Sequence, residues 1–143
     1  MSKKKIIGDV DLTSLYLKHL PDILKDITVS GNFVCNYNKL TSLIGAPKTV
    51  GGNFGCAYNK LTSLESAPTN VGGYFACYHN KLTSLQGAPK TVGGYFDCSI
   101  NELTSLEGAP KTVDGNFYCR NNPGKFTEAQ VRAICDVKGK VYV

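Results

Sequence analysis

Cysteine and histidine are the residue types in this chain best suited to chemistry, and the cysteines recur at a fixed spacing. Five of them follow one another every 21 residues: Cys35, Cys56, Cys77, Cys98 and Cys119. A sixth, Cys135, lies outside the series, and the two histidines are His19 and His79. An exposed thiol with a lowered pKa beside a histidine could act as a nucleophile.

The regular spacing favours structural thiols over reactive ones. Cysteines at equivalent positions of a repeat point the same way, and inside a core free cysteine packs as a small apolar side chain. The chain has no C-x-x-C pair, which disfavours a zinc or redox motif. We expect no catalytic residue, no metal ligand and no cofactor, and therefore no enzyme. A cysteine nucleophile, a disulfide framework and a metal ladder are the alternatives left open.

A 21-residue unit underlies the cysteine spacing. The tetrapeptide Leu-Thr-Ser-Leu begins at Leu40, Leu61, Leu82 and Leu103. A fixed period of this length indicates stacked units, because one unit cannot bury its apolar face alone. With 143 residues and 42% apolar content, the chain is large enough for one domain with a continuous core.

Each unit predicts one turn of a coil. Phe54 and Cys56 alternate with period two, which predicts a short strand with both side chains inside. Asn59 follows at a corner, where its amide is expected to pair with backbone groups of adjacent coils. Pro68 predicts an extended return with no full helix. Gly73 precedes the next strand, and every unit has a glycine at this position. We expect these glycines to permit a tight turn or a positive φ.

The ends of the chain differ from the repeat, as terminal caps do. We expect residues 1–28 to form an N-terminal cap with a short helical turn after Pro21. Residues 29–122 are expected to form about five coils, and residues 123–143 a C-terminal cap that ends in a strand at 141–143.

A capping helix is expected within the C-terminal segment. The sequence Thr127-Glu-Ala-Gln130 has the spacing of a capping box and predicts a helix over 127–136. Val131 and Ile134, together with Cys135, are expected to lie over the open end of the core.

The repeat resembles the leucine-rich repeat family. Phe54-x-Cys56-x-x-Asn59-x-Leu61 and its equivalents are similar to the family pattern L-x-L-x-x-N-x-L, with Phe and Cys where the family prefers Leu or Val. The proline-containing return looks like the short bacterial subtype. The resemblance implies a mainly β repeat solenoid with a parallel sheet on one face and an extended return on the other. The near-identical repeat sequence Leu-Thr-Ser-Leu-x-Gly-Ala-Pro-Lys-x-Val-Gly-Gly also resembles repeats in uncharacterised bacteriophage proteins.

The candidate binding residues lie beside the strand Phe and Cys, at positions that alternation turns outward. These positions vary while the scaffold does not, and they are rich in tyrosine, which suits protein recognition. We call seven of them the tyrosine patch: Tyr74, Tyr78, His79, Tyr95, Asp97, Tyr118 and Arg120. The patch predicts a binding module for a protein partner, which the phage resemblance would make a bacterial host component. Alternatively, the tyrosines only stack on one another along parallel strands.

Two lysine series follow the same period. Lys39, Lys60 and Lys81 form one register, and Lys48, Lys90 and Lys111 form the other. A basic stripe can contact phosphates, so a nucleic-acid or nucleotide ligand is the alternative to a protein partner. Solvated lysines that keep a long sheet protein soluble are the simpler interpretation.

Charge and hydropathy predict a soluble protein. The net charge is +5, but three of the sixteen basic residues are Lys3, Lys4 and Lys5. The other thirteen are nearly balanced by eleven acidic residues. Only Ile6 and Ile7 continue the basic run as apolar residues, whereas a secretory signal has roughly 7–15. No stretch approaches the roughly 18 apolar residues of a membrane span. We expect a cytoplasmic location, in the bacterial host if the chain is phage-encoded, and no membrane partner.

Overall fold

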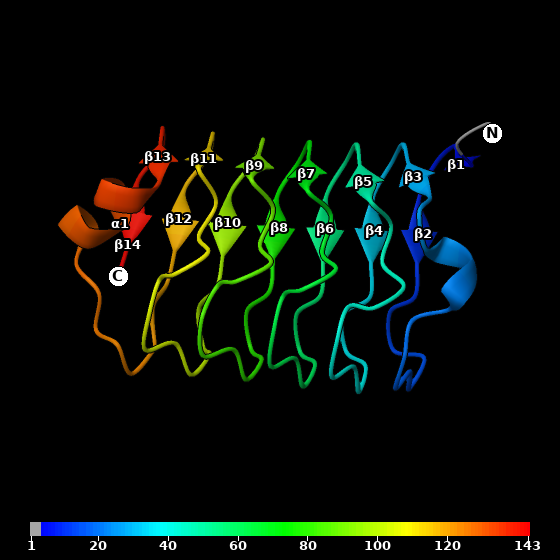
Figure 1. Cartoon of the computed structure of the whole chain (residues 1–143), viewed down its shortest axis with the longest axis horizontal. Coiled ribbons are helices and arrows are strands. Elements are labelled where there is room, and N and C mark those ends of the chain that lie inside the picture. The colour runs from blue at the N-terminus through cyan, green and yellow to red at the C-terminus, as the bar shows by residue number, and fades with distance from the viewer. Residues whose placement is uncertain (1–3) are drawn as a thin grey trace.

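Each 21-residue unit forms one turn of a parallel β-solenoid in the computed structural model of the chain (Figure 1). The structure describes residues 4–143, so Lys3 of the basic run lies outside the described residues. Two parallel sheets run along the solenoid, and each contains seven strands. The predicted mainly β repeat solenoid is therefore confirmed.

The first sheet is built from the Phe-x-Cys segments, and we call it the phenylalanine sheet. Its strands are β2 (Val10–Asp11), β4 (Phe33–Val34), β6 (Phe54–Gly55), β8 (Phe75–Ala76), β10 (Phe96–Asp97), β12 (Phe117–Tyr118) and β14 (Val141–Tyr142). Neighbouring strands pair in register, as in the alignment of Phe54 with Phe75. Identical residues of successive units therefore stand directly beside one another.

The extended return carries a second ladder, the valine sheet, where the sequence indicated only an extended segment. Its strands are β1 (Lys5–Ile6), β3 (Thr28–Val29), β5 (Thr49–Val50), β7 (Asn70–Val71), β9 (Thr91–Val92), β11 (Thr112–Val113) and β13 (Asp136–Val137). An extended segment that repeats in register places its N–H and C=O groups opposite those of the next coil. Pairing satisfies groups that would otherwise lack partners.

The core lies inside the coils, between the phenylalanine sheet, the valine sheet and the Leu-Thr-Ser-Leu segments that connect them. Five stacked phenylalanine rings run through it, with neighbouring centroids 5.1–5.7 Å apart: Phe33, Phe54, Phe75, Phe96 and Phe117. The five repeat cysteines and the valines of the return are buried with them, as are both leucines of the four Leu-Thr-Ser-Leu segments that begin at Leu40, Leu61, Leu82 and Leu103. The predicted inward columns are thus confirmed.

An asparagine ladder closes the corner after each cysteine, as expected. In the central coil, Asn80 Oδ1 accepts the N–H of Leu61 at 3.0 Å. Its Nδ2 donates to the carbonyls of Cys56 at 3.0 Å, Cys77 at 3.1 Å and Tyr78 at 3.4 Å. One buried amide therefore satisfies backbone groups of two coils, which compensates for its own burial.

The glycine column before the phenylalanine strands serves close approach, and the expectation of positive φ there is wrong. A Cβ on Gly94 would lie 2.8 Å from the Tyr74 nitrogen of the preceding coil, and φ is not positive at this position. Positive φ instead occurs one residue before each ladder asparagine, at Tyr37, Tyr58 and His79 among others. The chain reverses at that corner, so the left-handed conformation falls there.

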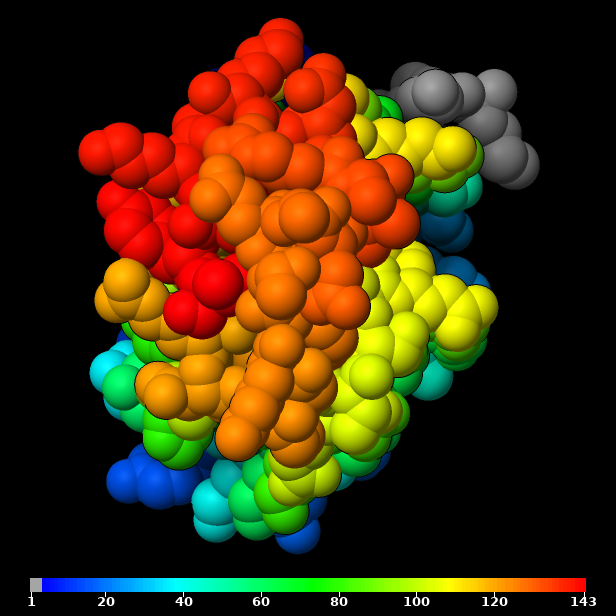
Figure 2. All heavy atoms as spheres, turned by 90° about the vertical axis from the view of Figure 1, so that its left-hand side faces the viewer, coloured from blue at the N-terminus to red at the C-terminus, as the bar shows by residue number. Residues whose placement is uncertain are grey.

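Both caps extend the sheets, so the stack has seven strand positions per sheet and is longer than the five coils expected. In the N-terminal cap, the short 3-10 helix η1 (Asp22–Leu24) buries Leu24, which confirms the predicted helical turn. The C-terminal helix α1 (Glu128–Ile134) lies across the other end of the solenoid (Figure 2).

The C-terminal helix begins with the predicted capping box. Thr127 Oγ1 accepts the Gln130 N–H at 3.2 Å, and Gln130 Oε1 accepts the Thr127 N–H at 2.9 Å. Val131 and Cys135 are buried, but Ile134 is 49% exposed, so its predicted place over the core is wrong. The helix ends at Ile134, and Cys135 is its C-cap with extended backbone at φ −135° and ψ 130°, so the chain leaves the helix before the buried thiol.

Candidate functional site

Four tyrosines form a continuous row on the outer side of the phenylalanine sheet. Tyr74 and Tyr95 stack in parallel with centroids 4.7 Å apart and an interplanar angle of 11°. The edge of one ring meets the face of the other between Tyr95 and Tyr118, at 5.8 Å and 90°. Tyr118 stacks on Tyr142 at 4.8 Å and 5°. Three predicted patch residues are therefore in contact with one another.

Tyr142 belongs to this row, although the sequence analysis did not include it in the patch. Register brings it there, because strand β14 aligns Tyr142 with Tyr118. The guanidinium of Arg120 lies 5.0 Å from the Tyr142 ring centroid, a cation–π contact. Aligning the last strand with the repeat would have provided the missing signal.

His79 belongs to a second aromatic group, which we call the corner stack. Its ring stacks on Tyr58 at 4.4 Å, and Tyr58 stacks on Tyr37 at the same distance. Tyr37 and Tyr58 are further members that the predicted patch lacked. All three residues occupy the left-handed corner of successive coils, with φ between 55° and 59°.

Tyr78 lies near both the corner stack and the tyrosine row. Its ring meets Tyr58 edge to face, with centroids 5.5 Å apart. Burial raises the pKa of the Tyr78 hydroxyl, and the neighbouring Tyr37, Tyr58, Asp97 and Tyr74 raise it further. Tyr78 thus contacts the corner stack through Tyr58 and is close enough to Tyr74 of the row to feel its influence.

The Tyr95 hydroxyl in the middle of the row stays protonated at neutral pH. Burial raises the pKa of Tyr95 to about 12, and the proximity of Tyr74 and Asp97 adds to the shift. The Asp97 carboxylate itself accepts the Ser99 N–H at 2.9 Å. Tyr118 Oη accepts a hydrogen bond from Asn116 Nδ2 at 3.1 Å. The row can therefore donate hydrogen bonds while presenting apolar ring surface.

Two small residues on the outer side of the phenylalanine sheet are buried. Ala76 points outward by strand alternation, and Ala57 follows the preceding Cys at the same outer side, yet both are buried. The large side chains around them must therefore cover them. Rings that rest on a filled surface have few rotamers to lose on binding, which suits a recognition surface.

The cysteines occupy an environment that suppresses thiolate chemistry. All six are free and buried. Burial raises the pKa of the Cys35 thiol to about 12, and burial together with the neighbouring Cys56 raises that of Cys77 well above 9.0. His79 lies outside on the corner stack and is exposed. In residues 4–143, no three metal-binding side chains come together in a cluster.

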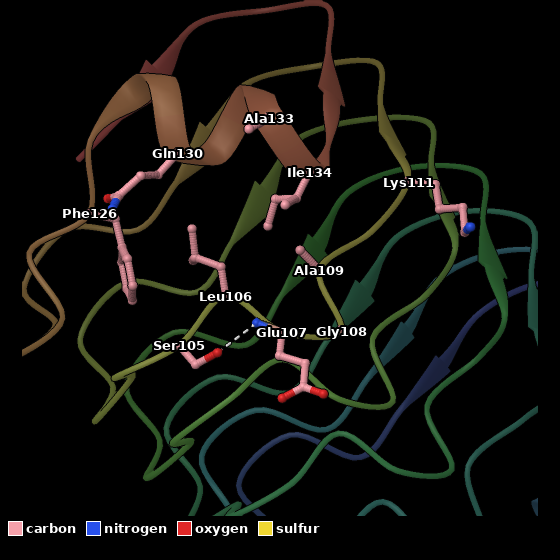
Figure 3. A pocket seen from close by; sticks show the side chains of 10 residues that line it. All are labelled: Ser105, Leu106, Glu107, Gly108, Ala109, Lys111, Phe126, Gln130, Ala133 and Ile134. Atoms are coloured by element: carbon pink, nitrogen blue, oxygen red, sulfur yellow. Dashed lines mark hydrogen bonds between the residues drawn. The ribbon is translucent and has the colours of Figure 1, made fainter.

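A hollow lies away from the tyrosine patch, between helix α1 and the return of the last repeat (Figure 3). It encloses about 730 Å³. Leu106, Phe126 and Ile134 supply much of its apolar lining, and Glu107 and Lys111 are its charged residues. The sequence does not predict this hollow, because Ile134, which lines it, was expected to pack inward. None of these residues belongs to the tyrosine patch.

These features define the class of protein as a parallel β-solenoid repeat protein with an aromatic strand face. Comparison with family models, curated proteins and solved structures finds no significant match. Within the described part of the chain, no helix is long and apolar enough to cross a membrane.

Proposed function

We propose that the chain is a non-enzymatic binding module that engages a protein partner through the tyrosine row and Tyr78. The observation that supports this most directly is the continuous, half-buried row from Tyr74 to Tyr142, with ring centroids 4.7–5.8 Å apart. Tyrosines offer large contact area, and rings held by their neighbours lose little conformational entropy on binding.

The resemblance to leucine-rich repeats supports the same proposal, because repeat proteins commonly bind with an extended solenoid surface. The bacteriophage resemblance leads us to propose a component of a bacterial host as the partner, met in the host cytoplasm. A bacterial lysate is therefore the appropriate source for affinity capture.

Affinity capture with matched variants tests the proposal. We expect the double variant Tyr95→Ala/Tyr118→Ala to lose a partner that the wild-type chain captures. The control Tyr16→Ala removes a highly exposed tyrosine outside the row and should keep that partner. Urea unfolding of each variant separates the two interpretations of the tyrosines. If the rings only stabilise the sheet, the double variant loses stability while its captured proteins stay those of the wild type.

A further inference from the structure

A cationic series borders the corner stack along three successive coils. Lys39, Lys60 and Lys81 each lie two residues after a corner aromatic, and all three are exposed. Their backbones are in register, since the Lys60 N–H donates to Leu40 O at 2.8 Å and the Lys81 N–H to Leu61 O at 2.9 Å. At about 4.8 Å per coil, the series spans about 10 Å.

The lysines and the aromatics of the corner end at the same coil. The next coil places Ile100 where Tyr37, Tyr58 and His79 stand, and Glu102 where the lysines stand. The lysines thus accompany the corner stack and not the whole solenoid. We call the six residues Tyr37, Lys39, Tyr58, Lys60, His79 and Lys81 the basic ridge.

The charge of the basic ridge is not neutralised by the protein itself. Over residues 4–143, the ion pairs join Lys48 to Asp26, Arg132 to Glu128 and Lys138 to Asp114, and none involves a ridge lysine. The Lys39 ammonium lies 5.7 Å from the centroid of the Tyr16 ring. Three like charges one coil apart repel one another, and an anionic ligand would relieve that repulsion.

We infer that the basic ridge receives an acidic, extended segment of the protein partner that occupies the tyrosine row. This inference rests on the proposed function, because Tyr78, which belongs to the proposed binding surface, meets the ridge residue Tyr58 edge to face. The 10 Å span corresponds to about three residues of extended chain. Glu102 ends the cationic series and repels acidic residues, so it fixes which coils the acidic segment can occupy.

The ring geometry favours an acidic peptide over single-stranded nucleic acid. Binding of single strands uses the faces of aromatic rings as platforms for bases. In the ridge both faces of Tyr58 are occupied, by Tyr37 at 9° and by His79 at 22°, so only the outer faces of the two end rings remain for bases. The ridge therefore presents ring edges, hydroxyls and ammonium groups, which match carboxylates.

The test is a titration of the full chain with a fluorescein-labelled hexaglutamate peptide, followed by fluorescence anisotropy. We expect Lys39→Gln/Lys60→Gln/Lys81→Gln to weaken binding about ten-fold, since each exposed ion pair contributes roughly a factor of two. The matched control Lys48→Gln/Lys90→Gln/Lys111→Gln removes the same charge from the other series. It should weaken binding by no more than about two-fold, because salt screens distant charges.

A gain of affinity provides a second measurement. Glu102→Lys extends the cationic series by one coil and should strengthen hexaglutamate binding about two- to three-fold. Equal losses in the two triple variants, absence of binding, or no gain from Glu102→Lys would overturn the inference. Tighter binding of a thymidine hexanucleotide through the same three lysines would overturn it in favour of nucleic acid.

The titration is independent of the proposed function. Tyr95→Ala/Tyr118→Ala should bind hexaglutamate as the wild-type chain does, even where it loses a captured protein. Failure of the titration therefore refutes the basic ridge alone, and unchanged capture by the double variant refutes the tyrosine row alone.

Discussion

The buried thiols are expected to make the protein unstable at alkaline pH. All six cysteines are free and buried. Burial raises the pKa of Cys35 from its ordinary value of 9.0 to about 12, and those of Cys119 and Cys135 to about 11. The three central thiols, Cys56, Cys77 and Cys98, shift in the same direction, chiefly through burial and further through neighbouring thiols.

The direction in which stability changes with pH follows from how many protons the folded and unfolded states bind. Below pH 9 the thiols are protonated in both the folded and the unfolded state, so they do not reduce the free energy of unfolding. Above pH 9 the unfolded chain releases protons that the folded chain retains, so the free energy of unfolding falls as pH rises toward the folded pKa values. Relative to neutral pH, each of the four most deeply buried thiols, Cys35, Cys56, Cys77 and Cys98, lowers the free energy of unfolding by about 1.4 kcal/mol at pH 10. Together these four lower it by about 6 kcal/mol, against a typical domain stability of about 5–15 kcal/mol, and the less deeply buried Cys119 and Cys135 add a smaller amount.

Urea unfolding followed by circular dichroism, with a reductant present, measures this dependence from neutral pH to pH 10. The variant Cys56→Ala/Cys77→Ala lacks two of the six thiols and should lose about a third of the pH slope, although it is less stable at neutral pH. A free energy of unfolding that stays constant up to pH 10 would refute the reasoning. An unchanged slope in the double variant would refute its assignment to the thiols.

Two further predictions concern the corner. Asn80→Ala leaves the buried Leu61 N–H without its acceptor, while the Cys56 and Cys77 carbonyls each lose one of two amide donors. It should lower the free energy of unfolding by about 3 kcal/mol in urea titration, and a loss below about 1 kcal/mol would contradict the role given to the ladder. Ile100 has φ of 53°, unfavourable for a β-branched residue, so Ile100→Asn should raise the thermal midpoint by relieving about 1 kcal/mol. Ile44→Asn, at an exposed site without positive φ, should give no such gain.

The repeat made the interior predictable. Equivalent side chains 21 residues apart must face the same way, so Phe54, Cys56 and Leu61 could be assigned to the core from the period and their apolar character alone. The Asn59 column followed because a buried amide needs backbone partners. The capping box at Thr127 was also predictable, since its hydrogen bonds are local in sequence.

The exposed surface was less predictable, because contacts between coils depend on register and backbone conformation. The sequence grouped His79 with Tyr95, but the left-handed corner stacks His79 on Tyr58 instead. Tyr142 joined the row only through the register of β14. The lysine series was visible in the sequence, whereas its position beside a closed stack of rings was not.

The sequence by itself determined the solenoid, its inward columns and its two capped ends, because one period fixes which side chains share a core. Tertiary structure decided the second sheet, the outward turn of Ile134 and the division of the aromatics into a row and a corner stack. These features depend on the rise per coil and on the φ angles at the corner, which place side chains of neighbouring coils against one another.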